Sequence, residues 1–215
     1  MKRSSRLLFA LAALLLAGSV VWGADTSMLK PPKGSKVAIL VFEDMECPQC
    51  ARVAPMLHEA AKKYNVALVQ HDFPLRQHPW SYQAAVNARY FDSKSEKLGD
   101  EYRLYVFANQ NSITKQNLQG VTEKWASDHK VEFPFMVDPS GQYAGKVESD
   151  RQLGEKIPLD HTPTVYIATD TAHGVEVSEV KDINDLYQML DAAVKKAGPT
   201  TTVAKKPAAH KAANR

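Results

Sequence analysis

The stretch Lys36-Val-Ala-Ile-Leu-Val-Phe-Glu-Asp-Met-Glu-Cys-Pro-Gln-Cys50 decides how this chain folds. Its first seven residues, 36–42, form an almost continuous apolar run rich in branched side chains, which is typical of a buried β-strand. From Cys50 to about Lys63, apolar residues recur at three- and four-residue spacing, which predicts a helix. Residues 66–71 favour a second strand. The order strand, short turn, helix, strand predicts a βαβ unit with both cysteines at the turn.

After this unit the sequence predicts a mostly helical middle and a smaller part that contains two more strands. Helices are expected at about 81–91, 97–109, 114–120, 121–129 and 151–156, strands at 164–168 and 174–180, and a closing amphipathic helix at 183–197. This order, βαβ then helices then ββα, is an α/β fold with a helical insertion at about residues 80–150. The domain of residues 36–198 is long enough to bury a core.

The two ends of the chain differ in composition from this domain. Residues 1–23 join a basic start to an apolar run and small residues, which predicts a secretory signal peptide, with an uncleaved membrane anchor as the alternative. Residues 24–35 form a linker. Residues 199–215 are basic and lack hydrophobic periodicity, which predicts a disordered tail. Export implies a periplasmic or other extracytoplasmic location, where disulfides persist.

The charge balance limits the kinds of partner. The whole chain carries 27 Lys and Arg residues against 24 Asp and Glu. The signal segment holds three of the basic residues and the tail four, so the domain has a slight acidic excess. No nucleic-acid partner is expected, because such proteins carry a basic surface. The linker is too short to be a dimerisation segment, so a monomer is expected.

Cys47 and Cys50 are the only cysteines of the chain. A bridge that closes so small a loop adds little stability, so we attribute the pair to reactivity. At a helix N-terminus, unpaired N–H groups and the helix dipole favour the thiolate and lower its pKa. Cys47 is therefore expected to be the exposed nucleophile that attacks a disulfide, and Cys50, one helical turn further, the buried resolving thiol.

Five neighbouring residues are expected to modulate the pair. Pro48 stiffens the turn, and Gln49 adds a dipole but no charge, so the first cysteine should be less acidic than in the strongest oxidants. Glu43, Asp44 and Glu46 are acidic, and carboxylates near a thiolate raise its pKa. Together these residues predict a pair that is less oxidising than the helix end alone would make it.

Alternatives to redox catalysis remain open. A metal site would need two more ligands, and none of His58, His71, His78 and His161 has zinc-finger spacing to the cysteines. No metal and no other cofactor is therefore expected. The cysteines could instead form an inert bridge in a non-catalytic binding module, or the domain could deliver a metal.

Several segments resemble DsbA-like thiol–disulfide oxidoreductases of the thioredoxin superfamily. They are residues 42–50, 72–79, 107–110 and 161–165, within a resemblance that spans about residues 36–197. The resemblance implies a thioredoxin fold with a helical insertion. It also implies a cis Thr162–Pro163 bond beside Cys47, with Thr162 and Pro163 shaping a groove for an extended substrate segment.

The resemblance also implies a function, with one departure from the family pattern. It implies disulfide exchange with protein cysteines, and we favour an oxidase over a reductase or isomerase. A membrane redox partner would reoxidise or reduce the two cysteines after each reaction. Thioredoxins carry a buried acid six positions before the first cysteine, but this chain has Val41 there. Either Glu43 or a water molecule would then take over the proton transfer, or the proton transfer would be slower.

Overall fold

The described part of this computed structural model, residues 25–198, contains four strands and six α-helices. The strands are β1 (Val37–Glu43), β2 (Ala67–Asp72), β3 (Thr164–Thr171) and β4 (Gly174–Glu179). The helices are α1 (Pro48–Tyr64), α2 (Ser81–Lys94), α3 (Glu96–Asn109), α4 (Leu118–Asp128), α5 (Gln142–Lys156) and α6 (Leu186–Ala197), with 3₁₀ turns η1 (Gln110–Ser112) and η2 (Ile183–Asp185). The predicted signal peptide and basic tail lie outside the described residues.

The four strands form one sheet in the order β2-β1-β3-β4. Strand β1 runs parallel to β2 and antiparallel to β3, and β3 runs antiparallel to β4. All seven residues of β1 are buried, as its continuous apolar run predicts for a strand covered on both faces. The register pairs Glu43 with Asp72, so two carboxylates meet at one end of the sheet.

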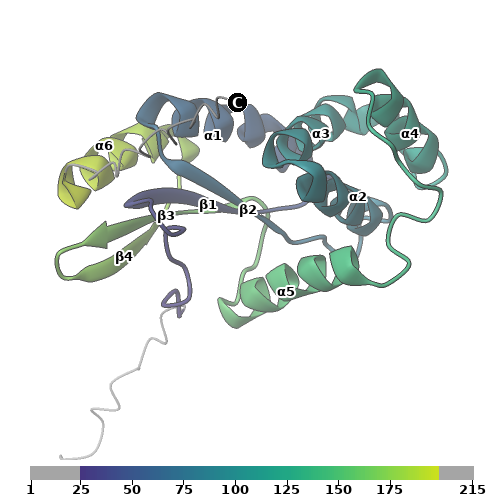
Figure 1. Ribbon diagram of the computed structural model, residues 1–215. Helices are drawn as coiled ribbons and strands as arrows, with labels where there is room; N and C mark the ends of the chain where they lie inside the picture. The colour runs from purple at the N-terminus through teal and green to yellow at the C-terminus, as the bar shows by residue number, and fades with distance from the viewer. Residues whose placement is uncertain (1–24, 199–215) are drawn as a thin grey trace, which may run out of the picture.

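Successive side chains of β1 point to opposite faces of the sheet. Val37, Ile39 and Val41 belong to a core cluster with apolar residues of α1 and α6, which lie together on one side of the sheet (Figure 1). Leu40 and Phe42 belong to a second cluster, with residues from the end of α5 and from the chain that precedes the sheet. Helices α1 and α6 therefore cover one side of the sheet, and the end of α5, which belongs to the helical insertion, helps to cover the other.

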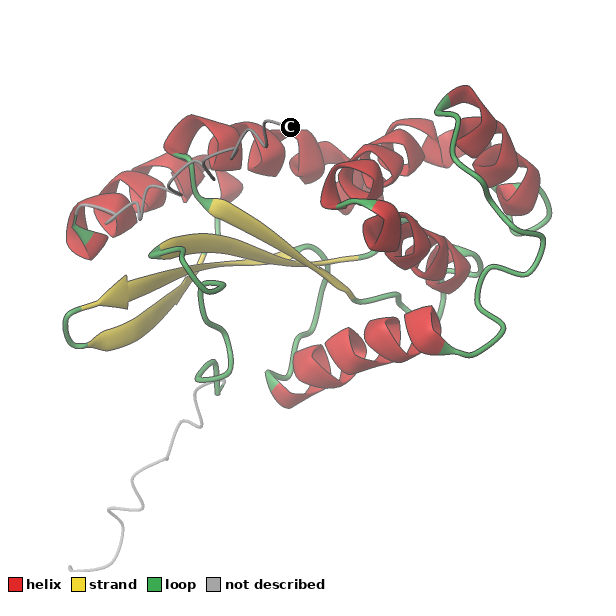
Figure 2. Ribbon diagram, in the orientation of Figure 1, coloured by secondary structure: helices red, strands yellow, loops and turns green. Residues whose placement is uncertain are grey.

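Helices α2 to α5 follow β2 in the sequence, precede β3, and gather beside one end of the sheet (Figure 2). Their core is largely aromatic and contains Trp80, Tyr90, Phe91, Tyr102, Phe107 and Trp125. Met45, Cys47, Cys50 and Ala54 belong to the same cluster. The helical insertion thus packs directly against the turn that carries both cysteines.

Two helices differ from the sequence-based expectation. Residues 114–120 and 121–129 do not form two short helices, because α4 continues through the expected break with one buried face that includes Trp125. Helix α5 begins well before residue 151 and has only two buried residues, Val147 and Gly154. Two buried positions do not make an apolar stripe, so hydrophobic periodicity could not reveal this helix.

Candidate functional site

The cysteine turn lies where β1 ends and α1 begins. Cys47 is the N-cap residue of α1 and has an extended backbone, and Pro48 occupies the first helical turn, where the missing N–H is not needed. The N–H of Cys47 donates to the carbonyl of Asp44 at 3.0 Å and closes the turn. Because no side chain caps this end of α1, its backbone N–H groups remain available to a negative charge at Cys47.

Both cysteines are free thiols, and both are buried. Cys47 is 8% exposed and Cys50 is 1% exposed, whereas Pro48 and Gln49 between them are exposed. The expectation of an exposed Cys47 is therefore wrong in degree, although Cys47 is the more accessible of the two. The sulfur of Cys50 accepts the N–H of Asp44 at 3.4 Å.

The loop before β3 brings Thr162 to the side of Cys47. The Cys47 thiol donates to the carbonyl oxygen of Thr162, with an S···O distance of 3.3 Å, although 115 residues separate the two. The Thr162–Pro163 peptide bond is cis, as the family resemblance implies. Thr162 is buried and its hydroxyl has no hydrogen-bond partner among residues 25–198, while Pro163 is half-buried.

These surroundings make the two cysteines electrostatically unequal. The pKa of Cys47 falls from its ordinary 9.0 to about 5, mainly because of the hydrogen bond with Cys50. Burial opposes this fall. Hydrogen bonds with Thr162 and with the backbone N–H groups of Cys50 and Gln49 lower the pKa further. The pKa of Cys50 is raised, chiefly by burial. At neutral pH these pKa values favour a thiolate at Cys47 and a thiol at Cys50, so the hydrogen bond that Cys47 donates to Thr162 belongs to its protonated form. The pKa of Cys47 is thus lowered, as its place at a helix N-terminus predicts, and the expectation that it is less acidic than in the strongest oxidants stays a prediction.

Two of the three acidic neighbours serve the local structure instead. The carboxylate of Asp44 accepts the N–H of Glu46 at 2.7 Å and the N–H of Leu75 at 2.6 Å. It also pairs with ring nitrogen Nδ1 of His78 at 2.8 Å. Glu46 accepts the N–H groups of the N-cap and first residues of α2 at 2.9 and 3.2 Å, and so caps that helix from outside.

Glu43 occupies a different environment. It shares a face of β1 with Val41, because the two residues are two positions apart on a strand. It is 3% exposed, accepts Nε2 of Gln70 at 3.1 Å, and lies 4.0 Å from Nε of Arg103. Burial raises the pKa of Glu43 to about 8, against the opposing effect of Arg103. Glu43 therefore holds a proton at neutral pH, and it contributes to the raised pKa of Cys50.

The helical insertion adds a residue that the sequence analysis did not assign to the site. Gln110, the first residue of η1, donates from its side-chain Nε2 to the carbonyl of Met45 at 2.7 Å and to that of Cys47 at 2.9 Å. These partners lie 65 and 63 residues away in the sequence, so no local pattern could have indicated the contact.

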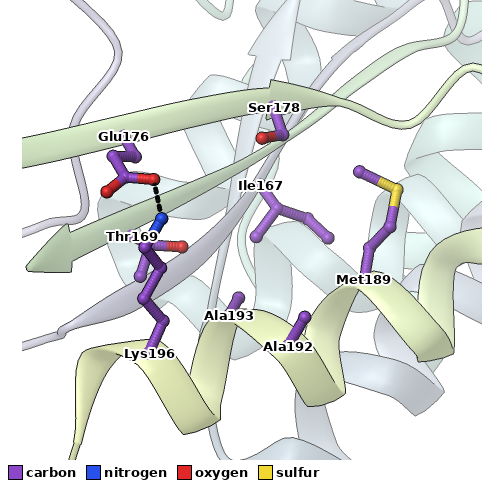
Figure 3. A pocket seen from close by; sticks show the side chains of 8 residues that line it. All are labelled: Ile167, Thr169, Glu176, Ser178, Met189, Ala192, Ala193 and Lys196. Atoms are coloured by element: carbon purple, nitrogen blue, oxygen red, sulfur yellow. Dashed lines mark hydrogen bonds and ion pairs between the residues drawn. The ribbon is translucent and has the colours of Figure 1, made fainter.

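A separate hollow of about 200 Å³ lies between α6 and strands β3 and β4 (Figure 3). Ile167 and Met189 line it, and an ion pair between Glu176 on β4 and Lys196 on α6 joins its two walls. Neither cysteine lines this hollow, so it is distinct from the candidate site. Within residues 25–198, no three His, Cys, Asp or Glu side chains are grouped to hold a metal ion.

None of the helices within residues 25–198 combines the length and the apolar character that crossing a bilayer requires.

Comparison with known proteins gives a family match and a set of similar structures. Residues 26–192 match the protein-family model described as Thioredoxin. The solved structure of alpha-DsbA1 from Wolbachia pipientis has a TM-score of 0.62 at 16% identity, covering 79% of this chain and 90% of that one. BdbD from Bacillus subtilis in its oxidised form has a TM-score of 0.61 at 16% identity, covering 77% and 96%. NmDsbA1 from N. meningitidis has a TM-score of 0.55 at 21% identity, covering 79% and 87%.

Curated relatives include two larger proteins. The Na(+)/H(+) antiporter NhaA 3 of Salinispora tropica is 23% identical over 154 residues, and the Na(+)/H(+) antiporter NhaA 1 of Salinispora arenicola is 24% identical over 157 residues. Each alignment covers 70% of this chain and 23% of the antiporter. The chain therefore spans about a quarter of the length of these relatives.

Proposed function

Because the chain belongs to the thioredoxin family, we propose that it is a dithiol–disulfide oxidoreductase that donates disulfides to protein cysteines outside the cytoplasm. One observation carries the proposal: Cys47 is the N-cap residue of α1, its sulfur lies 3.3 Å from the carbonyl oxygen of Thr162, and this setting lowers its pKa to about 5. The fold shared with DsbA proteins and with BdbD supports it.

The proposed reaction is a pair of thiol–disulfide exchanges. A substrate thiolate attacks the Cys47 sulfur of the Cys47–Cys50 disulfide, the bond between the two cysteines breaks, and Cys50 leaves and takes up a proton. The second substrate thiolate then attacks the substrate sulfur of this mixed disulfide and releases Cys47 as a thiolate. The substrate loses two electrons as its disulfide forms, and the cysteine pair gains them.

The low pKa of Cys47 supports the oxidising direction. A thiolate of low pKa is a good leaving group, and its stability favours the reduced form of the enzyme, which makes the disulfide form a stronger oxidant. Of the two cysteines, Cys47 is also the one bonded to the Thr162 loop, where an extended substrate segment would pair with the backbone.

Glu43 is the proposed proton donor to Cys50. The thiolate that leaves from Cys50 is buried, and burial is the main cause of its raised pKa, so it needs a proton as it forms. Glu43 is buried and protonated at neutral pH, with a pKa of about 8. It thus offers the acid that this chain lacks at Val41, two positions earlier on the same face of β1.

The location and the redox partner also belong to the proposal. The predicted signal peptide at residues 1–23 supports work in the periplasm or another extracytoplasmic compartment. A disulfide donor must be reoxidised after each turnover, so a membrane redox partner is proposed to accept electrons from Cys47 and Cys50.

The test is the oxidation of a reduced peptide that contains two cysteines, followed with the wild-type protein and two variants. Cys47→Ser should abolish oxidation, because the attacked sulfur is absent. Cys50→Ser should accumulate a mixed disulfide between Cys47 and the added oxidised peptide, because the resolving thiol is absent. Wild-type activity in Cys47→Ser would contradict the proposal. A reduction potential at or below about −270 mV, the value of thioredoxin, would contradict the oxidising direction.

A further inference from the structure

The amide of Gln110 makes the contact that joins the helical insertion to the backbone of the cysteine turn. Its Nε2 group donates both of its hydrogens, one to the carbonyl of Met45 and one to the carbonyl of Cys47, at 2.7 and 2.9 Å. The Cys47 carbonyl also accepts the N–H of Ala51 at 3.2 Å, which is the first hydrogen bond of α1. Gln110 thus holds the turn on both sides of Glu46 and at the point where the helix begins.

The 3₁₀ turn that carries Gln110 is itself held in place. The side-chain amide of Asn109 donates to the backbone carbonyl of Tyr105 at 2.7 Å. The Ser112 hydroxyl donates to the backbone carbonyl of Asn109 at 2.9 Å. Ile113 directly after the turn is buried in the core that also contains the cysteines. The Gln110 side chain is therefore presented from a fixed backbone, which is what a precise contact requires.

We propose that Gln110 is a positioning residue that holds the cysteine turn in the geometry that stabilises the Cys47 thiolate. Its N–H groups engage two carbonyl oxygens of the turn that carries Cys47, and the partial negative charges of those oxygens would otherwise oppose a thiolate there. The same bonds fix the start of α1, whose N–H groups favour negative charge at Cys47. This inference rests on the proposed function, because it concerns the redox chemistry of the same pair.

The redox consequence follows from the charge state of the reduced pair. Reduction of the Cys47–Cys50 disulfide takes up two electrons and, at neutral pH, one proton at Cys50, while Cys47 stays a thiolate. A contact that stabilises this thiolate therefore stabilises the reduced form and raises the reduction potential. Losing the contact should raise the pKa of Cys47 and make the protein a weaker oxidant.

The first experiment compares Gln110→Met with the matched variant Gln119→Met. Met has nearly the shape of Gln but donates no hydrogen bond, and Gln119 is a half-buried α4 residue that pairs only locally, with Glu123. In Gln110→Met, the equilibrium constant with glutathione should shift about threefold to tenfold toward the disulfide, which is about 15–30 mV for this two-electron couple. The thiolate absorbance should show a raised Cys47 pKa. Gln119→Met should match the wild type in both the equilibrium constant and the Cys47 pKa.

A second variant separates positioning from structural support. Gln110→Glu has the same shape, and its ionised form cannot donate and adds negative charge, so it should raise the Cys47 pKa more than Gln110→Met does. If Gln110→Met does not fold, the Cys47 pKa and the equilibrium constant with glutathione are measured in Gln110→Glu instead. For each variant, unfolding of the reduced and oxidised forms is measured separately. If Gln110 is a positioning residue, its substitution should destabilise the reduced form more than the oxidised form. If its role is merely structural, the substitution should destabilise both forms equally.

The outcomes separate this inference from the proposed function. A wild-type pKa and potential in both Gln110 variants would overturn the inference, whatever their stability. Failure of the wild-type protein to oxidise a peptide dithiol would overturn the proposed function, and the Cys47 pKa of Gln110→Met would still test the inference, because that measurement needs no substrate.

Discussion

Three titratable side chains at the end of β1 and the start of α1 have widely separated pKa values. Cys47 has a pKa of about 5, Glu43 has a pKa of about 8, and burial keeps Cys50 protonated. Titratable groups whose environments move their pKa values apart are a common feature of catalytic sites. The separation supports the proposed roles of Cys47 as a leaving group and of Glu43 as the proton donor.

The first prediction concerns the pH dependence of the reduced form. The pKa of Cys47 is about 5 when folded and near 9.0 when unfolded, so its stabilising effect is fully present above pH 9 and is lost as the pH falls to about 5. Between these values, the stability of the reduced form should rise relative to the oxidised form by at most about 1.4 kcal/mol per pH unit. Urea unfolding of both forms measures this rise. A difference that does not change with pH would contradict it.

The second prediction concerns Glu43→Gln. In the wild type the folded state keeps a proton that the unfolded state releases above pH 4.5, so Glu43 should lower stability as the pH rises from 4.5 to about 8. The variant should lack this decline, and it should slow Cys50 release in mixed-disulfide formation by about 100-fold, because the proton donor is gone. Stopped-flow exchange with a thiol measures that rate. Glu59→Gln, at an exposed position of α1, is the control, and equal behaviour of the two variants would contradict the prediction.

Part of the site could be predicted from the sequence, because the chemistry of its residues is local or carried by motifs. The two cysteines follow a strand and begin a helix, and Thr162 precedes a proline that opens another strand. A lowered pKa of Cys47 could be predicted from its place at a helix N-terminus, but the contribution of Thr162 to it could not, because that residue is distant in the sequence. The contact of Asp44 with His78 crosses 34 residues and that of Gln110 with Cys47 crosses 63, and only the folded chain brings them together.

At the scale of elements, strands and amphipathic helices could be predicted, but a helix that packs through few residues could not. The pattern of β1 is continuous because both of its faces are covered, and α6 buries Leu186, Leu190 and Ala193 on one stripe. Helix α5 is mostly polar and touches its neighbours through few positions, among them Gly154. The position of α5 depends on the close approach of its backbone to neighbouring side chains rather than on a stripe of buried apolar residues.

The third prediction tests this close approach with two glycines of α5. A Cβ at Gly154 would lie 2.5 Å from the ring of Phe73 and 2.9 Å from Leu159, whereas a Cβ at Gly145 would meet nothing within 4 Å. Gly154→Ala should therefore destabilise the protein by about 1–3 kcal/mol. Gly145→Ala should stabilise it by up to about 1 kcal/mol, because Ala is the better helix former. Chemical denaturation compares them, and equal effects of both substitutions would argue against tight packing at Gly154.

At the scale of the whole molecule, a buried ionic cluster links the helical insertion to the sheet. Arg103 on α3 is 1% exposed and binds Asp92 on α2 through two hydrogen bonds of 2.8 and 3.0 Å. It also lies 3.6 Å from Asp72 of β2 and 4.0 Å from Glu43 of β1. The cluster extends through Arg89, which pairs with Asp72 and with Asp150 of α5. Composition alone could not reveal it, because the whole chain is nearly neutral.

The last prediction is that Arg103→Met destabilises the protein by about 3–5 kcal/mol, because it leaves buried carboxylates without their cation. The loss should shrink as the pH falls, since burial raises the pKa of Asp72 and its protonated form needs no cation, whereas Glu43 is already protonated at neutral pH. Lys97→Met is the control: Lys97 pairs with Glu101 on the surface of the same helix and should cost less than about 1 kcal/mol. Urea unfolding at neutral and acidic pH measures both variants. Equal losses for Arg103→Met at the two pH values would show that packing of its side chain, rather than its charge, holds the insertion to the sheet.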